Sequence, residues 1–222
     1  MRRIKDIAPA QRARSPTVRA ALPKHAPGMR IGLLGGSFNP PHEGHRLASL
    51  IALRRLSLDR VWWLVTPGNP LKDNERLPPL AERIAAARRM ACHPLIDVTG
   101  FEAAIGARYS YTTVDYLKRR CPGVRFVWLI GADSLAGFDR WRRWRAIAAA
   151  LPIAVIDRPG STLAPLGAKA AQALRSARIA ESEARKLPKM RPPAWVFLHG
   201  PRSAVSSTAL RQRGDKPERG RR

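Results

Sequence analysis

The chain has 222 residues with a formal net charge of +25, and two of its residues are cysteine. This length suits one α/β domain with a sizeable core, or one domain with tails. No apolar run approaches the ~18 residues that span a bilayer, no signal-peptide hydrophobic region opens the chain, and Cys92 and Cys121 fit no metal or C-x-x-C spacing. We therefore expect a cytoplasmic protein with two free thiols and no membrane partner.

The positive charge favours a partner that is rich in phosphate, because arrays of Lys and Arg bind phosphate groups. Part of it lies at the ends: residues 1–28 carry a net +6 and residues 213–222 a net +3. Both stretches lack hydrophobic periodicity, so we expect two disordered basic tails around a body of residues 29–212. Met29 directly precedes the first predicted strand, and we consider either that translation starts there or that the tail is dispensable.

The first predicted strand runs over residues 31–34 and ends at the pair Gly35 and Gly36. Paired glycines allow positive φ and close approach of the backbone to a ligand. His42 and His45 follow, just before a helical pattern over residues 46–53. The histidines therefore lie where a strand feeds a helix, at the positive end of the helix dipole, which is where α/β proteins hold phosphates.

Other interpretations of this stretch fit less well. Neither G-x-G-x-x-G nor G-x-x-x-x-G-K-[ST] occurs, so the dinucleotide and Walker fingerprints are missing. A zinc helix of the metalloprotease kind needs H-E-x-x-H, whereas His42 and His45 are three apart with Gly44 between them. A purely structural pair of loop histidines stays open as an alternative.

Further strands and helices alternate along the rest of the chain. Buried, β-rich runs predict strands at residues 61–66, 96–98, 124–130, 153–156 and 195–198. Helical patterns cover residues 80–92 and 114–120, one or two surface helices are expected over residues 165–187, and another helix begins near residue 205. The hydroxyls of residues 110–113 suit an N-cap, and Trp141 and Trp144 are spaced to pack a core.

This alternation predicts a Rossmann-like doubly wound parallel sheet of the α/β class. Five loops that follow strands carry polar groups, and all five would lie at the carboxyl edge of that sheet. An open α/β sheet binds its ligand along this edge.

Two motifs resemble those of a known superfamily. Residues 35–45, G-G-S-F-N-P-P-H-E-G-H, resemble the first motif of the H-x-G-H nucleotidylyltransferases, in the form typical of bacterial nicotinate-mononucleotide adenylyltransferases. Residues 205–211 resemble their second signature, I-S-S-T-x-[IL]-R, with Val205 in place of Ile. The resemblance covers about residues 30–212, and it implies that residues 29–212 form a nucleotidylyltransferase domain.

The resemblance implies transfer of AMP from ATP to nicotinate mononucleotide, a step of NAD biosynthesis that gives deamido-NAD and pyrophosphate. The catalytic residues it implies are His42, His45, Lys72 (in the pattern N-P-x-K) and Arg211. The ATP-binding residues are Gly35, Gly36, Ser37, Phe38, Arg158, Ser206, Ser207 and Thr208. The residues for the nucleotide acceptor are Asn39, Ser110, Tyr111, Thr112, Asp133 and Trp141. We expect Mg²⁺ to be carried by ATP, because no carboxylate cluster offers a protein site for a metal.

Several alternatives remain within and outside this superfamily. Phosphopantetheine adenylyltransferases share both end motifs, but they are shorter and lack the G-x-D…W segment that ends here at Trp141. Cytidylyltransferases usually carry R-T-E-G-I-S-T-T, which fits residues 205–208 less well. Nicotinamide mononucleotide stays open as the acceptor, and so does an oligomeric state. From another class, a nucleic-acid-binding protein on the same fold is the less favoured alternative.

Overall fold

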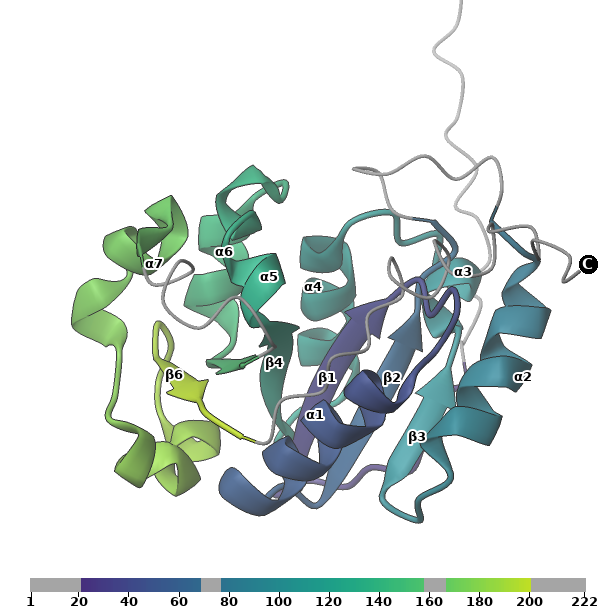
Figure 1. Cartoon of the computed structure of the whole chain (residues 1–222), viewed down its shortest axis with the longest axis horizontal. Helices are drawn as coiled ribbons and strands as arrows, with labels where there is room; N and C mark the ends of the chain where they lie inside the picture. The colour runs from purple at the N-terminus through teal and green to yellow at the C-terminus, as the bar shows by residue number, and fades with distance from the viewer. Residues whose placement is uncertain (1–20, 69–76, 158–166, 201–222) are drawn as a thin grey trace, which may run out of the picture.

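A computed structural model describes residues 21–68, 77–157 and 167–200 (Figure 1). Its centre is a six-stranded sheet in the order β3-β2-β1-β4-β5-β6, with every pair of neighbours parallel. The strands are β1 (Arg30–Gly36), β2 (Arg60–Val65), β3 (Ile96–Thr99), β4 (Arg125–Gly131), β5 (Ile153–Ile156) and β6 (Trp195–Leu198). The predicted parallel sheet is confirmed, and β5 and β6 have the predicted bounds.

Helices cover both faces of the sheet (Figure 1). The α-helices are α1 (Glu43–Arg55), α2 (Leu80–Ala91), α3 (Phe101–Ala104), α4 (Ser110–Arg120), α5 (Ala132–Leu135), α6 (Trp144–Ala150) and α7 (Lys169–Ala173). The 3₁₀ segments within the described residues are η1 (Phe138–Arg140), η3 (Arg175–Ala177) and η4 (Glu181–Lys189). The described part thus has the three-layer, doubly wound arrangement that the alternation of elements predicts.

Two hydrophobic cores form because side chains alternate across each strand. On one face, Leu33 and Trp62 pack with the buried residues of α4, α5 and α6. On the other face, Leu34 and Trp63 pack with α1, α2 and η4. Strands buried on both faces read as continuous apolar runs, which is why residues 61–65 are visible as a strand in the sequence.

The topology fixes where a ligand would bind. Strand β1 lies between β2 and β4, so the strand order reverses beside β1. Helix α1 leaves β1 for one face of the sheet, and the helices that follow β4 pack on the other. Open α/β sheets bind ligands outside the carboxyl ends of the strands at such a reversal.

The prediction of one or two surface helices over residues 165–187 is confirmed only in part for the described residues 167–187. The chain forms the five-residue helix α7 and then the 3₁₀ segments η3 and η4. Local composition favours an α-helix there, but Ala184 and Leu187 are buried against the sheet. Pro188, inside η4, also lacks the N–H that an α-helix would need.

The start of α4 also differs from the prediction. The helix begins at Ser110, its N-cap is Tyr109, and no side chain caps it. The hydroxyls of residues 110–113 therefore do not form the expected N-cap. Thr113 Oγ1 instead donates a hydrogen bond to Glu102 Oε1 over 2.6 Å.

Residues 21–28, predicted as part of a disordered tail, contact the body. Leu22 packs against the core that contains Trp62, and the ring of His25 meets the Trp62 ring edge-on at 5.8 Å between centroids. The Gly28 N–H donates to the carbonyl of Gly123 at 2.8 Å. The boundary of the folded part therefore lies before residue 29.

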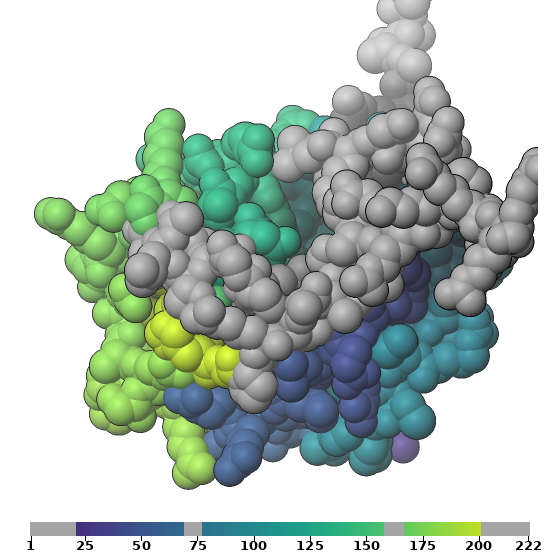
Figure 2. Space-filling view, viewed as in Figure 1, coloured from purple at the N-terminus to yellow at the C-terminus, as the bar shows by residue number. Residues whose placement is uncertain are grey.

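The carboxyl-terminal end of α1 is tied to β6 through η4. Arg55 forms an ion pair with Glu181 at 2.8 Å, and Glu181 also accepts a hydrogen bond from the His199 backbone at 2.9 Å. Residues of α1 (blue) and β6 (yellow) accordingly lie side by side on the surface in Figure 2.

Among the described residues, no helix has both the length and the apolar character needed to cross a membrane.

Candidate active site

The two histidines lie at the N-terminus of α1, beyond the carboxyl end of β1. His42 is the N-cap residue in an extended conformation, and His45 is the third residue of the helix. Their ring centroids are 3.9 Å apart, and the residues are only 2% and 8% exposed. The prediction that both stand where a strand feeds a helix is confirmed, so two imidazoles meet at the positive end of the helix dipole.

One hydrogen bond decides where the proton of His45 lies. The backbone N–H of His42 donates to His45 Nδ1 at 3.3 Å, so Nδ1 acts as an acceptor. A neutral imidazole with an accepting Nδ1 carries its proton on Nε2. His45 therefore offers an N–H donor from Nε2.

The ring of Phe38 packs against the ring of His45. Its ring stacks on Trp63 at 4.9 Å with an angle of 17° between the planes, and it meets the His45 ring at 4.8 Å. Phe38 has φ +47°, the left-handed region that favours glycine, whereas Gly35 and Gly36 belong to β1 and do not have positive φ. The positive φ that the glycine pair would allow is thus taken by the aromatic residue of the turn, while Gly35 is exposed.

A second contact holds the backbone of His45. The buried hydroxyl of Ser49 donates to the His45 carbonyl at 2.9 Å, and it accepts a hydrogen bond from Trp63 Nε1 at 2.7 Å. This chain of bonds attaches the first turns of α1 to the central strand β2. The catalytic candidate is therefore held by both its ring and its backbone.

Arg83 is a buried arginine that the sequence analysis missed. It is 3% exposed and donates to four backbone carbonyls in the loops beyond the sheet. Those bonds reach Ser37 (2.9 Å), Thr66 (2.8 Å), Pro67 (3.3 Å) and Pro78 (2.9 Å). Burial lowers the pKa of the guanidinium from its usual value, but arginine remains charged in proteins at neutral pH. Arg83 thus joins the loop after β1 to the loop after β2 and places a positive charge beneath both.

The predicted acceptor residues come together on the other side of β1. Tyr111 stands at the start of α4, with Ser110 and Thr112 beside it, all three half-buried. Two arginines from the segment before α6 lie over the tyrosines of this helix start. Arg142 is 4.8 Å from the centroid of the Tyr109 ring, and Arg143 is 5.0 Å from that of Tyr111.

Trp141 precedes these arginines and stands at the end of η1. It is half-buried and meets Trp128 and Phe138 edge-on, at 6.4 Å and 5.3 Å between centroids. Trp144, by contrast, is 6% exposed within the core, which confirms its predicted packing role. The structure therefore places the two residues that follow Trp141 over Tyr109 and Tyr111, whereas the role of Trp141 and of segment 110–112 in binding stays a prediction.

Among the other predicted site residues, the structure describes some, and the rest lie outside the described part. Asp133 is exposed in α5, directly after β4, and Asn39 is half-buried in the turn that leads to His42. Lys72, Arg158, Ser206, Ser207, Thr208 and Arg211 lie outside the described residues. Their predicted roles are therefore carried by the motifs alone.

Glu102 is a second buried charge-bearing residue that the sequence analysis missed. It lies in α3 and is 7% exposed. Burial raises the pKa of its carboxyl to about 7 from 4.5, although hydrogen bonds from the Thr113 and Thr66 side chains oppose the rise. This carboxyl therefore titrates near neutral pH.

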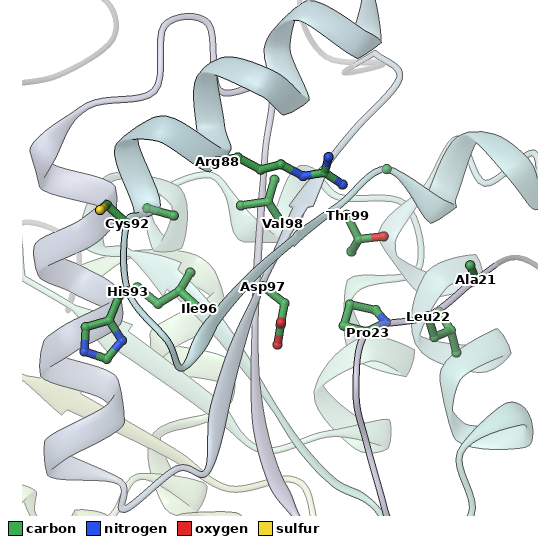
Figure 3. A pocket seen from close by; sticks show the side chains of 12 residues that line it. Ala21, Leu22, Pro23, Arg88, Cys92, His93, Ile96, Asp97, Val98 and Thr99 are labelled. Atoms are coloured by element: carbon green, nitrogen blue, oxygen red, sulfur yellow. The ribbon is translucent and has the colours of Figure 1, made fainter.

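A cavity of about 500 Å³ lies elsewhere, at the edge of the sheet (Figure 3). Its lining includes Arg88, His93, Asp97 and Thr99, from the end of α2 and from β3, and the segment of Leu22. None of the residues predicted to bind nucleotide lines it, so the cavity does not mark the candidate site.

In the part of the chain that is described, no group of three or more His, Cys, Asp or Glu side chains is arranged to hold a metal ion.

Comparison with known proteins agrees with this geometry. A model of the cytidylyltransferase-like family matches residues 33–213. A protein of Methylorubrum extorquens named "Probable nicotinate-nucleotide adenylyltransferase" is 62% identical over 185 residues, which are 83% of this chain and 100% of the relative. Relatives of the same name from a Bradyrhizobium species and from Rhizobium meliloti are 58% and 57% identical, covering 82% of this chain and 95% and 97% of their own lengths.

A solved structure supports the fold. The chain resembles Plasmodium falciparum nicotinic acid mononucleotide adenylyltransferase, in a complex with NaAD, with a TM-score of 0.60 and 16% sequence identity over 83% of each chain. At this identity the likeness concerns the fold alone. Because the family model spans most of the chain and the curated relatives match over nearly their whole lengths, the chain belongs to the nicotinate-nucleotide adenylyltransferase family of cytidylyltransferase-like nucleotidylyltransferases.

Proposed function

We propose that this protein transfers AMP from ATP to nicotinate mononucleotide, giving deamido-NAD and pyrophosphate. The observation that carries the proposal is the pair His42 and His45 at the N-terminus of α1, where the strand order reverses, in a chain of this family. A helix N-terminus with an imidazole donor suits phosphate groups that gain charge during the reaction.

The reaction needs no nucleophile from the protein. An oxygen of the acceptor's 5′-phosphate forms a bond to the α-phosphorus of ATP, and the bond from that phosphorus to the bridging oxygen breaks. The electron pair leaves on pyrophosphate. Catalysis is then a matter of positioning and of stabilising the charge on phosphate oxygens.

The named residues divide this work. His45 donates from Nε2, and His42 lies in contact with it, so both are assigned to the phosphate oxygens. Lys72 and Arg211, outside the described residues, are proposed to offset the charge of the triphosphate, and the hydroxyls of residues 206–208 to hold its leaving end. Mg²⁺ is proposed to arrive bound to ATP, since the described residues offer no metal cage of their own.

One feature favours an acidic acceptor over its amide. Arg142 and Arg143 lie over Tyr109 and Tyr111, at the start of the helix proposed to receive the pyridine ring. Positive charge there stabilises a nicotinate carboxylate and gives little to a neutral amide. Trp141, which directly precedes these two arginines, is the residue we assign to stacking on the ring.

The test is pyrophosphate release from ATP and Mg²⁺ by the purified protein with one of three acceptors: nicotinate mononucleotide, nicotinamide mononucleotide or phosphopantetheine. The highest kcat/KM is expected with nicotinate mononucleotide. A preference for the amide would reverse the argument from the two arginines. Release with none of the three would overturn the proposed reaction, and salt-dependent RNA binding by that inactive protein would support the nucleic-acid alternative.

A further inference from the structure

Glu102 is a buried carboxyl that the proposed reaction does not use, yet its hydrogen-bond partners lie next to two parts of the site. Its Oε1 accepts a hydrogen bond from Thr113 Oγ1 at 2.6 Å, and Thr113 is fully buried. Thr113 is the residue after Thr112 in α4, so the carboxyl is attached to the helix that carries the proposed acceptor segment.

Thr66, at the end of β2, is the second hydroxyl that acts on this carboxyl. Its Oγ1 donates a hydrogen bond to the carbonyl of Gly68 at 2.8 Å. A hydroxyl has one proton, so Thr66 donates either to Gly68 or to an ionised Glu102, and while it donates to Gly68 it accepts from a protonated Glu102. A protonated Glu102 therefore satisfies both threonines and Gly68, whereas an ionised carboxylate competes with Gly68 for the Thr66 proton.

The same turn is held from its other side by Arg83. The guanidinium donates to the carbonyls of Thr66 at 2.8 Å and Pro67 at 3.3 Å, and to that of Ser37 in the loop after β1 at 2.9 Å. A change in the Thr66–Gly68 turn is thus transmitted to the loop that carries residues 37–42. Glu102 stands where this turn, α3 and α4 meet.

We propose that Glu102 is a positioning residue of the adenylyl-transfer site, whose protonated carboxyl holds the Thr66–Gly68 turn and the start of α4 in their active arrangement. This inference rests on the proposed function. It adds a role for a residue whose hydrogen bonds go to Thr113 and Thr66 and not to the proposed catalytic or acceptor-binding side chains.

The surroundings make the carboxyl titrate in the neutral range. Burial raises its pKa to about 7, and only the two hydroxyls oppose the rise. Of the charged or titratable groups on the neighbouring elements, Arg83 binds carbonyls, Asp97 is paired with Arg60, and Tyr116 packs on Phe101. None of these groups is among the causes of the shift.

Two variants separate hydrogen bonding from packing. Glu102→Gln keeps an acceptor for Thr113 and a donor for Thr66, as the protonated carboxyl does, and Glu102→Leu has a similar size without either. At pH 6.5 the Gln variant is expected to stay within about threefold of the wild-type kcat/KM, and the Leu variant to lose roughly 10- to 100-fold, the scale of misplaced reacting groups.

The pH profile provides the readout that packing alone would not change. The ratio of wild-type to Gln-variant kcat/KM is expected to fall as pH rises through about 7, where the wild-type carboxyl ionises and the amide cannot. Taking the ratio cancels the titration of the substrate phosphates. A Leu variant that melts earlier but keeps the wild-type kcat/KM, or a ratio that is flat with pH, would overturn the inference.

A measurement without substrate keeps this inference separate from the proposed reaction. Backbone amide resonances of Thr66 and Gly68 are expected to titrate near pH 7 in the wild type and not in the Gln variant. If they do so while the wild type releases no pyrophosphate with any acceptor, the proposed function fails and the proton-linked turn stands. If turnover is normal but these amides do not titrate, the positioning role is refuted.

Discussion

His45 donates from a single ring nitrogen because its own helix occupies the other. The His42 N–H holds Nδ1, and the Ser49 hydroxyl holds the His45 carbonyl. Both contacts fix the ring relative to the N-terminus of α1. A donor that is already oriented loses little entropy when charge develops on a phosphate oxygen.

Replacing His45 by Ala removes this oriented donor. We expect kcat to fall roughly 10² to 10³-fold, the scale for loss of one oxyanion-type donor, with a smaller change in KM. Steady-state kinetics with ATP and nicotinate mononucleotide provide the measurement. Near-normal kcat in a folded variant would remove His45 from the chemistry.

Replacing Ser49 by Ala leaves the buried Trp63 Nε1 without its acceptor. The free energy of unfolding is expected to fall by about 1 to 3 kcal/mol, the cost of a buried unsatisfied donor, as measured by urea denaturation. The matched control is Trp63→Phe, which removes the donor. If the hydrogen bond is the cause, the double variant will cost less than the sum of the two single variants.

The raised pKa of Glu102 links stability to pH with a definite sign. The folded protein keeps this proton up to about pH 7, whereas the unfolded carboxyl releases it near 4.5. The stabilisation is therefore complete below pH 4.5 and is lost as pH rises through 7. Relative to Glu102→Gln, the wild type is expected to lose about 3 kcal/mol of unfolding free energy between pH 4.5 and 8, measured by denaturation at each pH. An unchanged difference would contradict the pKa.

At the scale of elements, the strands were predictable and the contacts between loops were not. The bounds of β5 and β6 follow from the runs Ile153–Ile156 and Trp195–Leu198, because strands buried on both faces must be apolar throughout. The turn that bears His42 was predictable because glycine and proline mark it. These signals are local, so the sequence displays them.

The features that sequence analysis missed depend on partners far along the chain. Arg83 looks like an ordinary helix residue, and its bond to Ser37 spans 46 positions. Thr113 has a hydroxyl that suits a cap, but Glu102, 11 positions earlier, binds it once α3 and α4 pack. Phe38 takes a positive φ that paired Gly35 and Gly36 would allow, and its ring stacks on Trp63. Tertiary contacts decide each of these cases.

The two tryptophans near α6 should respond differently to truncation. Trp141→Ala is expected to raise KM for nicotinate mononucleotide by about tenfold, the scale of a lost aromatic contact, and to change KM for ATP little. Trp144→Ala removes a buried side chain and should lower the free energy of unfolding by about 3 to 5 kcal/mol. Kinetics and urea denaturation of both variants test this. Equal effects of the two on KM would refute the assignment of Trp141.

At the scale of the whole molecule, the N-terminal segment belongs partly to the fold. Deleting residues 1–28 removes the packing of Leu22 and His25 and the bond from Gly28 to Gly123. We expect this deletion to lower the melting temperature by several degrees, about the effect of 1 kcal/mol, and deletion of residues 1–20 to leave these contacts in place. Thermal unfolding of both truncated chains measures this difference in melting temperature. Equal melting temperatures would restore the boundary at residue 28.

Salt acts differently on the two kinds of positive charge in this chain. Dissolved ions screen exposed Lys and Arg over about 8 Å at physiological ionic strength, so the general attraction of a +25 chain for polyanions weakens as salt is added. Arg83 is 3% exposed among backbone carbonyls, where counterions do not approach it. An anion held at the carboxyl edge therefore keeps a positive neighbour at ionic strengths that remove the less specific attraction of the surface.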